Sequence, residues 1–280
     1  MRKKVCVAGL LSGLCMIFAF RVSAQQLADT TQLSALGSWP SVALNDSAYA
    51  AKDPAQAPLK SSPKAANLKT NAVENNAVST LVNSRQELKK LNLTLKNNPK
   101  NVAAYTERGK LKFQLNKTGG AIKDFTVAIN LAPDEPETYY YRGLAFLKAN
   151  DYLGAVSDLT KRLNAEPAVN CFIARAKAKA LLLDYRGAII DNSKALELEA
   201  ENEEALYNRA VARFYLKDYT KAIEDFTTIL ERNKNLAETY FFRGLSKHKS
   251  GDIESGCLDL SKAGELGFEE AYESIKELCR

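Results

Sequence analysis

Apolar residues recur at intervals of three and four between about residues 100 and 267. Ala121, Phe125 and Ala128 follow this spacing in the first stretch. Such intervals place apolar side chains on one face of a helix, whereas a half-buried strand would alternate apolar and polar residues. Turn-like stretches separate the helical segments, and four of the five contain aspartate: LNKTGG, KANDY, LLLDY, YLKDY and KSGDI. The pattern therefore predicts short helices that are joined in pairs.

The helical pairs repeat with a fixed period. ETYYYRG at 137–143 returns as ETYFFRG at 238–244. Equivalent arginines are separated by 34, 33, 34 and 34 residues, at Arg108, Arg142, Arg175, Arg209 and Arg243. Three prolines that end second helices also recur at this period, at Pro99, Pro133 and Pro167. A period near 34 predicts a solenoid of stacked helical hairpins.

The repeat pattern resembles the tetratricopeptide repeat family, in a secreted bacterial form with Arg-Gly repeats. The pattern is Y-x-x-R-G, then Y-x-x-A, then an Asp-Phe pair. The second unit shows it with leucine in place of phenylalanine, as Tyr139, Arg142, Gly143, Tyr152, Ala155, Asp158 and Leu159. The resemblance implies an all-α, right-handed α-α superhelix of about five hairpins. The expected units are 101–134, 135–167, 168–201, 202–235 and 236–267 within 99–267.

The segments that flank the repeats have other compositions. Residues 1–24 combine MRKK with an apolar run and a small-residue exit, which predicts a secretory signal peptide cleaved after Ala24. Cys15 offers the alternative of a lipid attachment site, which bulky Leu14 disfavours. Residues 25–80 are rich in Ala, Ser, Asn and Pro, which predicts a disordered spacer. Residues 81–98 should form a capping helix or partial repeat, and 268–280 a C-terminal capping helix.

Charge and composition exclude some function classes. Cleavage of the signal would remove four bases and no acids, so the formal charge of +6 would fall to +2. A nucleic-acid partner would require a clustered basic face, and the sequence does not show one, so we expect no nucleic-acid partner. His248 is the only histidine, so we expect neither a histidine-based metal site nor a serine–histidine relay, and no cofactor. No membrane span is expected after signal cleavage, and the predicted location is the periplasm or the cell exterior.

Each repeat arginine has an aspartate 16 residues later. In a helical hairpin the two positions lie almost equally far from the turn, with a mismatch of about 1.5 Å. We therefore predict a ladder of structural ion pairs, either within each hairpin or shared with the adjoining repeat. The alternative is a row of arginines that binds an acidic ligand. It is less favoured because the negative charge of each aspartate neutralises the positive charge of its arginine. The predicted aspartates are Asp124, Asp158, Asp191, Asp225 and Asp259.

Three cysteines follow the predicted signal peptide. Cys257 and Cys279 could form a disulfide that fixes the closing helix, but their distances from the intervening turn differ by about 6 Å, so the spacing leaves the pairing open. Cys171 lies within a first helix and is expected to be a small buried thiol.

The family resemblance implies a concave groove that is lined by first helices. The partner-binding positions it suggests are Tyr140, Leu144, Lys148, Lys177, Tyr207, Val211, Tyr215, Phe241 and Lys249. Some of these aromatic residues should instead pack between repeats. An aromatic groove with a rim of lysines suits an extended peptide or a partner helix.

Three hypotheses for function follow. The first is a non-enzymatic scaffold or adaptor that binds a protein or peptide through the groove. The second is a structural subunit of a cell-envelope complex that docks through its convex face. The third is a hydrolase, which would need paired catalytic acids outside the repeat pattern, because the recurrent acids belong to the predicted ion pairs.

Overall fold

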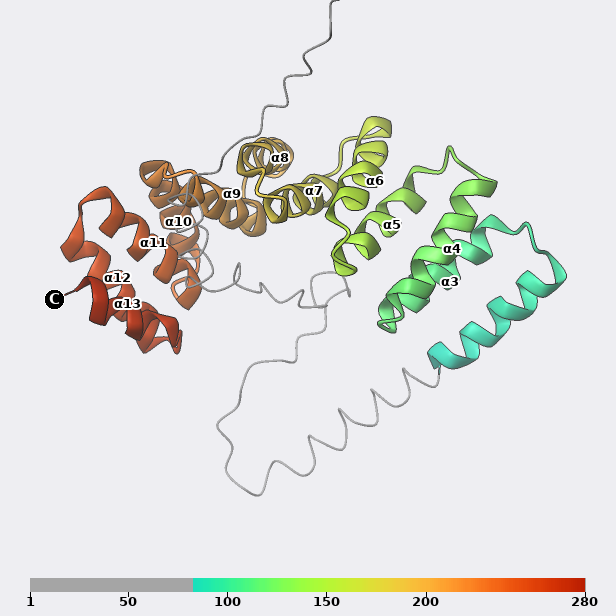
Figure 1. Cartoon of the computed structure of the whole chain (residues 1–280), viewed down its shortest axis with the longest axis horizontal. Coiled ribbons are helices and arrows are strands. Elements are labelled where there is room, and N and C mark those ends of the chain that lie inside the picture. Colours follow the sequence, from blue (N-terminus) through green and yellow to red (C-terminus); the bar gives the residue numbers. More distant parts are fainter. Residues whose placement is uncertain (1–82, 280) are drawn as a thin grey trace, which may run out of the picture. The chain divides into compact units, whose positions relative to one another are not determined.

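The computed structural model describes residues 83–279, which fall within one compact unit, Lys69–Arg280. A helix at 83–97 is followed by consecutive helical pairs (Figure 1). The pairs are α3 (Val102–Gln114) with α4 (Thr118–Leu131), α5 (Pro136–Lys148) with α6 (Tyr152–Ala165), α7 (Val169–Leu181) with α8 (Tyr185–Leu198), α9 (Glu203–Tyr215) with α10 (Tyr219–Arg232), and α11 (Ala237–Ser250) with α12 (Ile253–Glu265). Helix α13 (Glu270–Leu278) closes the series.

The prediction of an all-α stack of hairpins is confirmed, since the described residues contain helices and no strand. Each first helix packs on its own second helix, and each second helix packs on the first helix of the next pair. None of the described helices is both long enough and apolar enough to cross a membrane. The predicted signal peptide (1–24) and spacer (25–80) lie outside the described residues.

The turn between the two helices of a hairpin has the same backbone form in every repeat. One residue with positive φ lies one or two positions after the first helix, and the amide of the following residue bonds back to a carbonyl five residues earlier, as from Asp151 to Phe146. The positive-φ residues are Asn116, Asn150, Leu183, Lys217 and Gly251. The recurrent turn aspartates begin the second helices, because the side chains of Asp151, Asp184 and Asp252 accept hydrogen bonds from backbone amides of the first turn.

Small residues allow the two helices of a hairpin to approach closely. A Cβ atom added at Gly109 would lie 2.5 Å from the Phe125 ring, and one at Gly244 would lie 2.9 Å from the carbonyl oxygen of Gly256. Both distances are shorter than van der Waals contact, so these glycines are required by packing.

One core position breaks the repeat pattern. The residue after each ladder aspartate is Phe125, Leu159, Phe226 or Leu260 in four repeats, and each of these side chains is fully buried. The third repeat has Asn192 there, with an exposed fraction of 1%. Among the described residues, neither its amide nitrogen nor its side-chain oxygen has a hydrogen-bond partner. Burial of an unpaired amide is unfavourable, so Asn192 lowers the stability of this repeat relative to an apolar residue at the same position.

Asn192→Leu should therefore stabilise the protein by about 1–3 kcal/mol, because it removes an unsatisfied buried amide and restores the residue type of two other repeats. Urea unfolding followed by circular dichroism measures this change. Leu159→Asn is the matched reverse substitution and should destabilise the second repeat. An unchanged or lower midpoint for Asn192→Leu would show that the amide has favourable contacts at this position.

Candidate functional site

The arginine–aspartate ladder lies inside the hairpins. In all five repeats the arginine Nε donates to Oδ2 of the aspartate 16 residues later, at 2.6–3.0 Å, and Nη2 donates to Oδ1 at 2.7–2.9 Å. The aspartates are buried and the arginines half-buried. Two parallel charge-assisted bonds fix the relative position of the two helices in each hairpin. These side chains therefore have a structural role.

The ion pairs lie within the hairpins, but each ladder arginine also makes an unpredicted hydrogen bond to the preceding unit. The remaining nitrogen, Nη1, donates at 2.8–3.4 Å to a polar side chain on the second helix of the preceding unit. The acceptors are Asn92, Thr126, Thr160, Ser193 and Thr227. Because Asn92 has the same role as the repeat hydroxyls, the helix at 83–97 is equivalent to a second helix of a repeat. In the sequence, a hydroxyl residue stands two positions after each ladder aspartate, and this recurrence could have predicted the contact between repeats.

Most ladder aspartates hold a second cation in addition to the predicted arginine. Four aspartates contact a basic side chain four residues after the arginine, at 2.6–2.8 Å. These cations are Lys112, Lys179, Arg213 and Lys247. The second repeat has Phe146 at this position, and its ring lies 5.5 Å from the guanidinium carbon of Arg142. Four ladder sites therefore carry two positive charges for one negative charge.

The first helices form one layer of the stack. Each contacts the first helix of the next repeat, from α3 through α5, α7 and α9 to α11, and among the described residues no second helix packs comparably on another second helix. This closer approach makes the first helices the inner layer. The predicted groove residues all lie on these helices.

Three of the nine predicted groove residues are in the core, which corrects that part of the prediction. Leu144 packs with Ala174 and Ala178 of the next first helix. Val211 is fully buried, and Phe241 is covered by Phe268, with ring centroids 4.8 Å apart. At these positions the first helix faces its neighbour, so the side chains fill the contact between repeats and offer no surface to a partner.

The other six predicted residues keep some exposure, and Lys249 is the most exposed. Tyr207 lies edge-on to Phe226 and Phe242 and so belongs mainly to the core. Tyr215 stacks on Tyr185 at 5.0 Å. The six residues are Tyr140, Lys148, Lys177, Tyr207, Tyr215 and Lys249.

Both signs of charge occur on the first-helix layer. Burial lowers the pKa of Lys177, and the carboxylate of Glu204 opposes that shift. Burial raises the pKa of Glu238; the nearby Tyr207 hydroxyl opposes the rise and the charge of Glu270 adds to it. A ligand that supplies opposite charges or hydrogen bonds would therefore stabilise the ionised forms of these groups.

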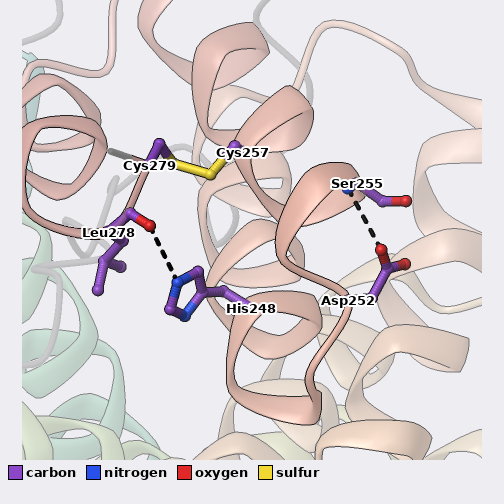
Figure 2. The surroundings of a disulfide bond; sticks show 6 residues. All are labelled: His248, Asp252, Ser255, Cys257, Leu278 and Cys279. Carbon is purple, nitrogen blue, oxygen red and sulfur yellow. Dashed lines mark hydrogen bonds between the residues drawn. A yellow bond between two sulfur atoms is a disulfide. The ribbon is translucent and has the colours of Figure 1, made fainter.

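The C-terminal helix is fixed by a covalent bond. Cys257 of α12 and Cys279 after α13 form a disulfide with their Cα atoms 5.8 Å apart (Figure 2). Beside it, Nε2 of His248 on α11 lies 3.2 Å from the carbonyl oxygen of Leu278. The histidine therefore contributes to the C-terminal cap. Cys171 is a buried free thiol, and burial raises its pKa to about 11, so it is protonated at neutral pH.

No group of three or more His, Cys, Asp or Glu residues in the described part of the chain could hold a metal ion. Residues 203–236, which contain α9 and α10, match the family model of the tetratricopeptide repeat. The solved structure of YrrB, described as a TPR protein with an unusual peptide-binding site, aligns with a TM-score of 0.61 at 18% identity and covers 66% of this chain and 97% of YrrB. The described hairpins have the tetratricopeptide repeat (TPR) fold.

Other similar proteins share this architecture. The type IV pilus biogenesis factor PilW aligns with a TM-score of 0.59 at 17% identity, over 76% of this chain and 99% of PilW. Human tetratricopeptide repeat protein 13 is 27% identical over 57% of this chain and 19% of its own length. Hsc70-interacting protein 1 of Drosophila melanogaster is 38% identical over 32% of this chain and 24% of its own length. The TPR hairpins thus match only a minor part of these two relatives.

Proposed function

We propose that this TPR protein is a non-enzymatic scaffold or adaptor that binds a protein or peptide partner through its first-helix layer. The observation that carries the proposal is the continuous contact of α3, α5, α7, α9 and α11, which gathers tyrosines and lysines from several repeats into one layer. Aromatic side chains supply contact area and lysines favour acidic neighbours. Similarity to Hsc70-interacting protein 1 supports a protein partner.

The location that we propose is the periplasm or the cell exterior, in a secreted bacterial form of the repeat. The basic start, apolar run and small-residue exit of residues 1–24 support this proposal. The disulfide between Cys257 and Cys279 also supports it, because such bonds persist in oxidising compartments.

Affinity capture from an envelope extract, followed by mass spectrometry, identifies the partner, and titration with the purified partner then tests the surface. Lys177→Glu combined with Lys249→Glu should weaken binding by at least about tenfold, because both lysines belong to the first-helix layer. Lys123→Glu is the control, since this exposed lysine is on second helix α4. Equal weakening by the control, or none by the double variant, would contradict the proposed surface.

A further inference from the structure

The first and last helices of the described stack carry opposite charge. The helix at 83–97 contains four bases and one acid, and Glu269 together with α13 contains four acids and one base, so the formal charges are +3 and −3. All ten of these side chains are exposed. On the N-terminal helix they are Arg85, Glu87, Lys89, Lys90 and Lys96. At the C-terminal end they are Glu269, Glu270, Glu273, Lys276 and Glu277.

The excess charge of each helix gathers on one face. The minority charges are neutralised within their own helices, since Glu87 pairs with Lys90 at 3.2 Å and Lys276 pairs with Glu273 at 2.7 Å. Bases at intervals of four and seven residues share one face of the N-terminal helix, at Arg85, Lys89 and Lys96. Acids at intervals of three and four residues share one face of α13, at Glu270, Glu273 and Glu277. One end of the stack therefore has a basic face and the other has an acidic face.

The charges of the two end helices differ from those of their counterparts inside the stack. The helix at 83–97 is equivalent to a second helix, and the second helices α4, α6, α8 and α10 have formal charges between −1 and +1, with −2 for α12. Helix α13 packs on α12 as each first helix packs on the second helix before it. The five first helices have zero or positive formal charge, whereas α13 is acidic. Both end helices are thus exceptions to the charge of the repeats.

Each end of the described stack also presents half of a hairpin. The C-terminal end of one copy offers the type of helix that a second helix has beside it in every repeat. Close packing is not available at the N-terminal end, because Glu87 stands where four repeats have Ala121, Ala155, Ala188 and Ala222. A contact between the two ends would therefore depend on the charged faces rather than on a buried core.

We propose that the acidic face of α13 in one copy binds the basic face of the helix at 83–97 in a second copy, so that copies of this chain associate head to tail. Contacts between two N-terminal or two C-terminal faces are disfavoured, because they would place like charges together. Since the two contact surfaces differ, each contact leaves one basic and one acidic end free, and association continues to longer chains or closes into a ring. The contact uses the ends of the stack and is independent of the proposed first-helix site.

Sedimentation of the full chain over a series of concentrations tests this proposal. The average mass should rise with protein concentration at low ionic strength. Raising the ionic strength from about 0.01 M to about 0.1 M shortens the Debye length from about 30 Å to about 10 Å, so association should weaken by at least about tenfold.

Two charge-reversal variants block one end each. Arg85→Glu with Lys89→Glu reverses the basic face, and Glu273→Lys with Glu277→Lys reverses the acidic face. Each variant alone should associate at least about tenfold more weakly than the unaltered chain, because its two ends then have the same sign. An equal mixture of the two variants should form a dimer that does not grow, because each variant keeps one unaltered end and those two ends are complementary.

Arg186→Glu with Lys194→Glu is the matched control, since these exposed residues of α8 give the same change in net charge inside the stack. The proposal would be overturned by a monomeric unaltered chain at low ionic strength, by equal weakening in the control, or by a mixture without a dimer. Weakening by only one of the two end variants would also overturn it, and so would assemblies that nuclease dissolves, because nucleic acid would then occupy the basic face. Matching circular dichroism spectra establish that each variant is folded.

Discussion

Asp191→Ala should lower the free energy of unfolding by about 3–5 kcal/mol, which is the cost of leaving buried charges without their counter-ion. The side chain of Asp191 is 1% exposed and holds Arg175 at 2.7 Å and Lys179 at 2.8 Å. Its removal leaves two half-buried cations that repel each other inside one hairpin. Urea unfolding followed by circular dichroism measures the change.

Glu107→Ala is the matched control for a surface ion pair. Glu107 binds Lys110 at 3.0 Å, but its side chain is 58% exposed, so we expect a loss of less than about 1 kcal/mol. If the two substitutions had equal effects, the ladder would contribute no more than an ordinary surface pair.

Loss of the disulfide should produce the second large effect. Cys279→Ser should lower the free energy of unfolding by about 3 kcal/mol, because the bond between residues 22 apart restricts the unfolded chain. The change should also loosen α13, which packs mainly on α12. Urea unfolding of the oxidised proteins measures stability, and hydrogen exchange of residues 270–278 reports local opening.

Reductant provides the control for this experiment. Dithiothreitol should lower the midpoint of the unaltered protein to that of Cys279→Ser and leave the variant unchanged. Identical midpoints for the unaltered protein with and without reductant would mean that the noncovalent contacts of the cap already determine its stability. Those contacts include the hydrogen bond from the Tyr272 hydroxyl to the Gly264 carbonyl oxygen, at 2.9 Å.

The period and the arginine–aspartate spacing were enough to predict the helical hairpins, because both follow from residues that recur at fixed intervals. The same reasoning could not separate groove from core on the first helices. Leu144 and Tyr140 are one helical turn apart, yet Leu144 is buried and Tyr140 is only partly covered. The tilt of one repeat against the next decides this difference, and no local pattern encodes that tilt.

Some features of the structure depart from the repeat pattern, and the sequence alone could not predict them. Asn192 follows a ladder aspartate as an apolar residue does elsewhere, and its position alone does not show that both amide atoms lack partners. Residue spacing alone does not decide the disulfide, because a height counted from residue numbers assumes that the chain is helical up to Cys279. In the structure, Gly267 has φ of 91° and Cys279 lies beyond the end of α13, so the backbone can bring the two sulfur atoms together.

The hydrogen bond from each arginine to the preceding repeat gives the array a direction. Every repeat is attached to the unit before it, and the last acceptor position, Ser261, has Glu277 rather than arginine 16 residues later. Since stability in such arrays depends on coupling between neighbours, this attachment should make internal repeats harder to open than terminal ones. Opening should therefore begin at the ends and advance inward as a boundary between ordered and open repeats.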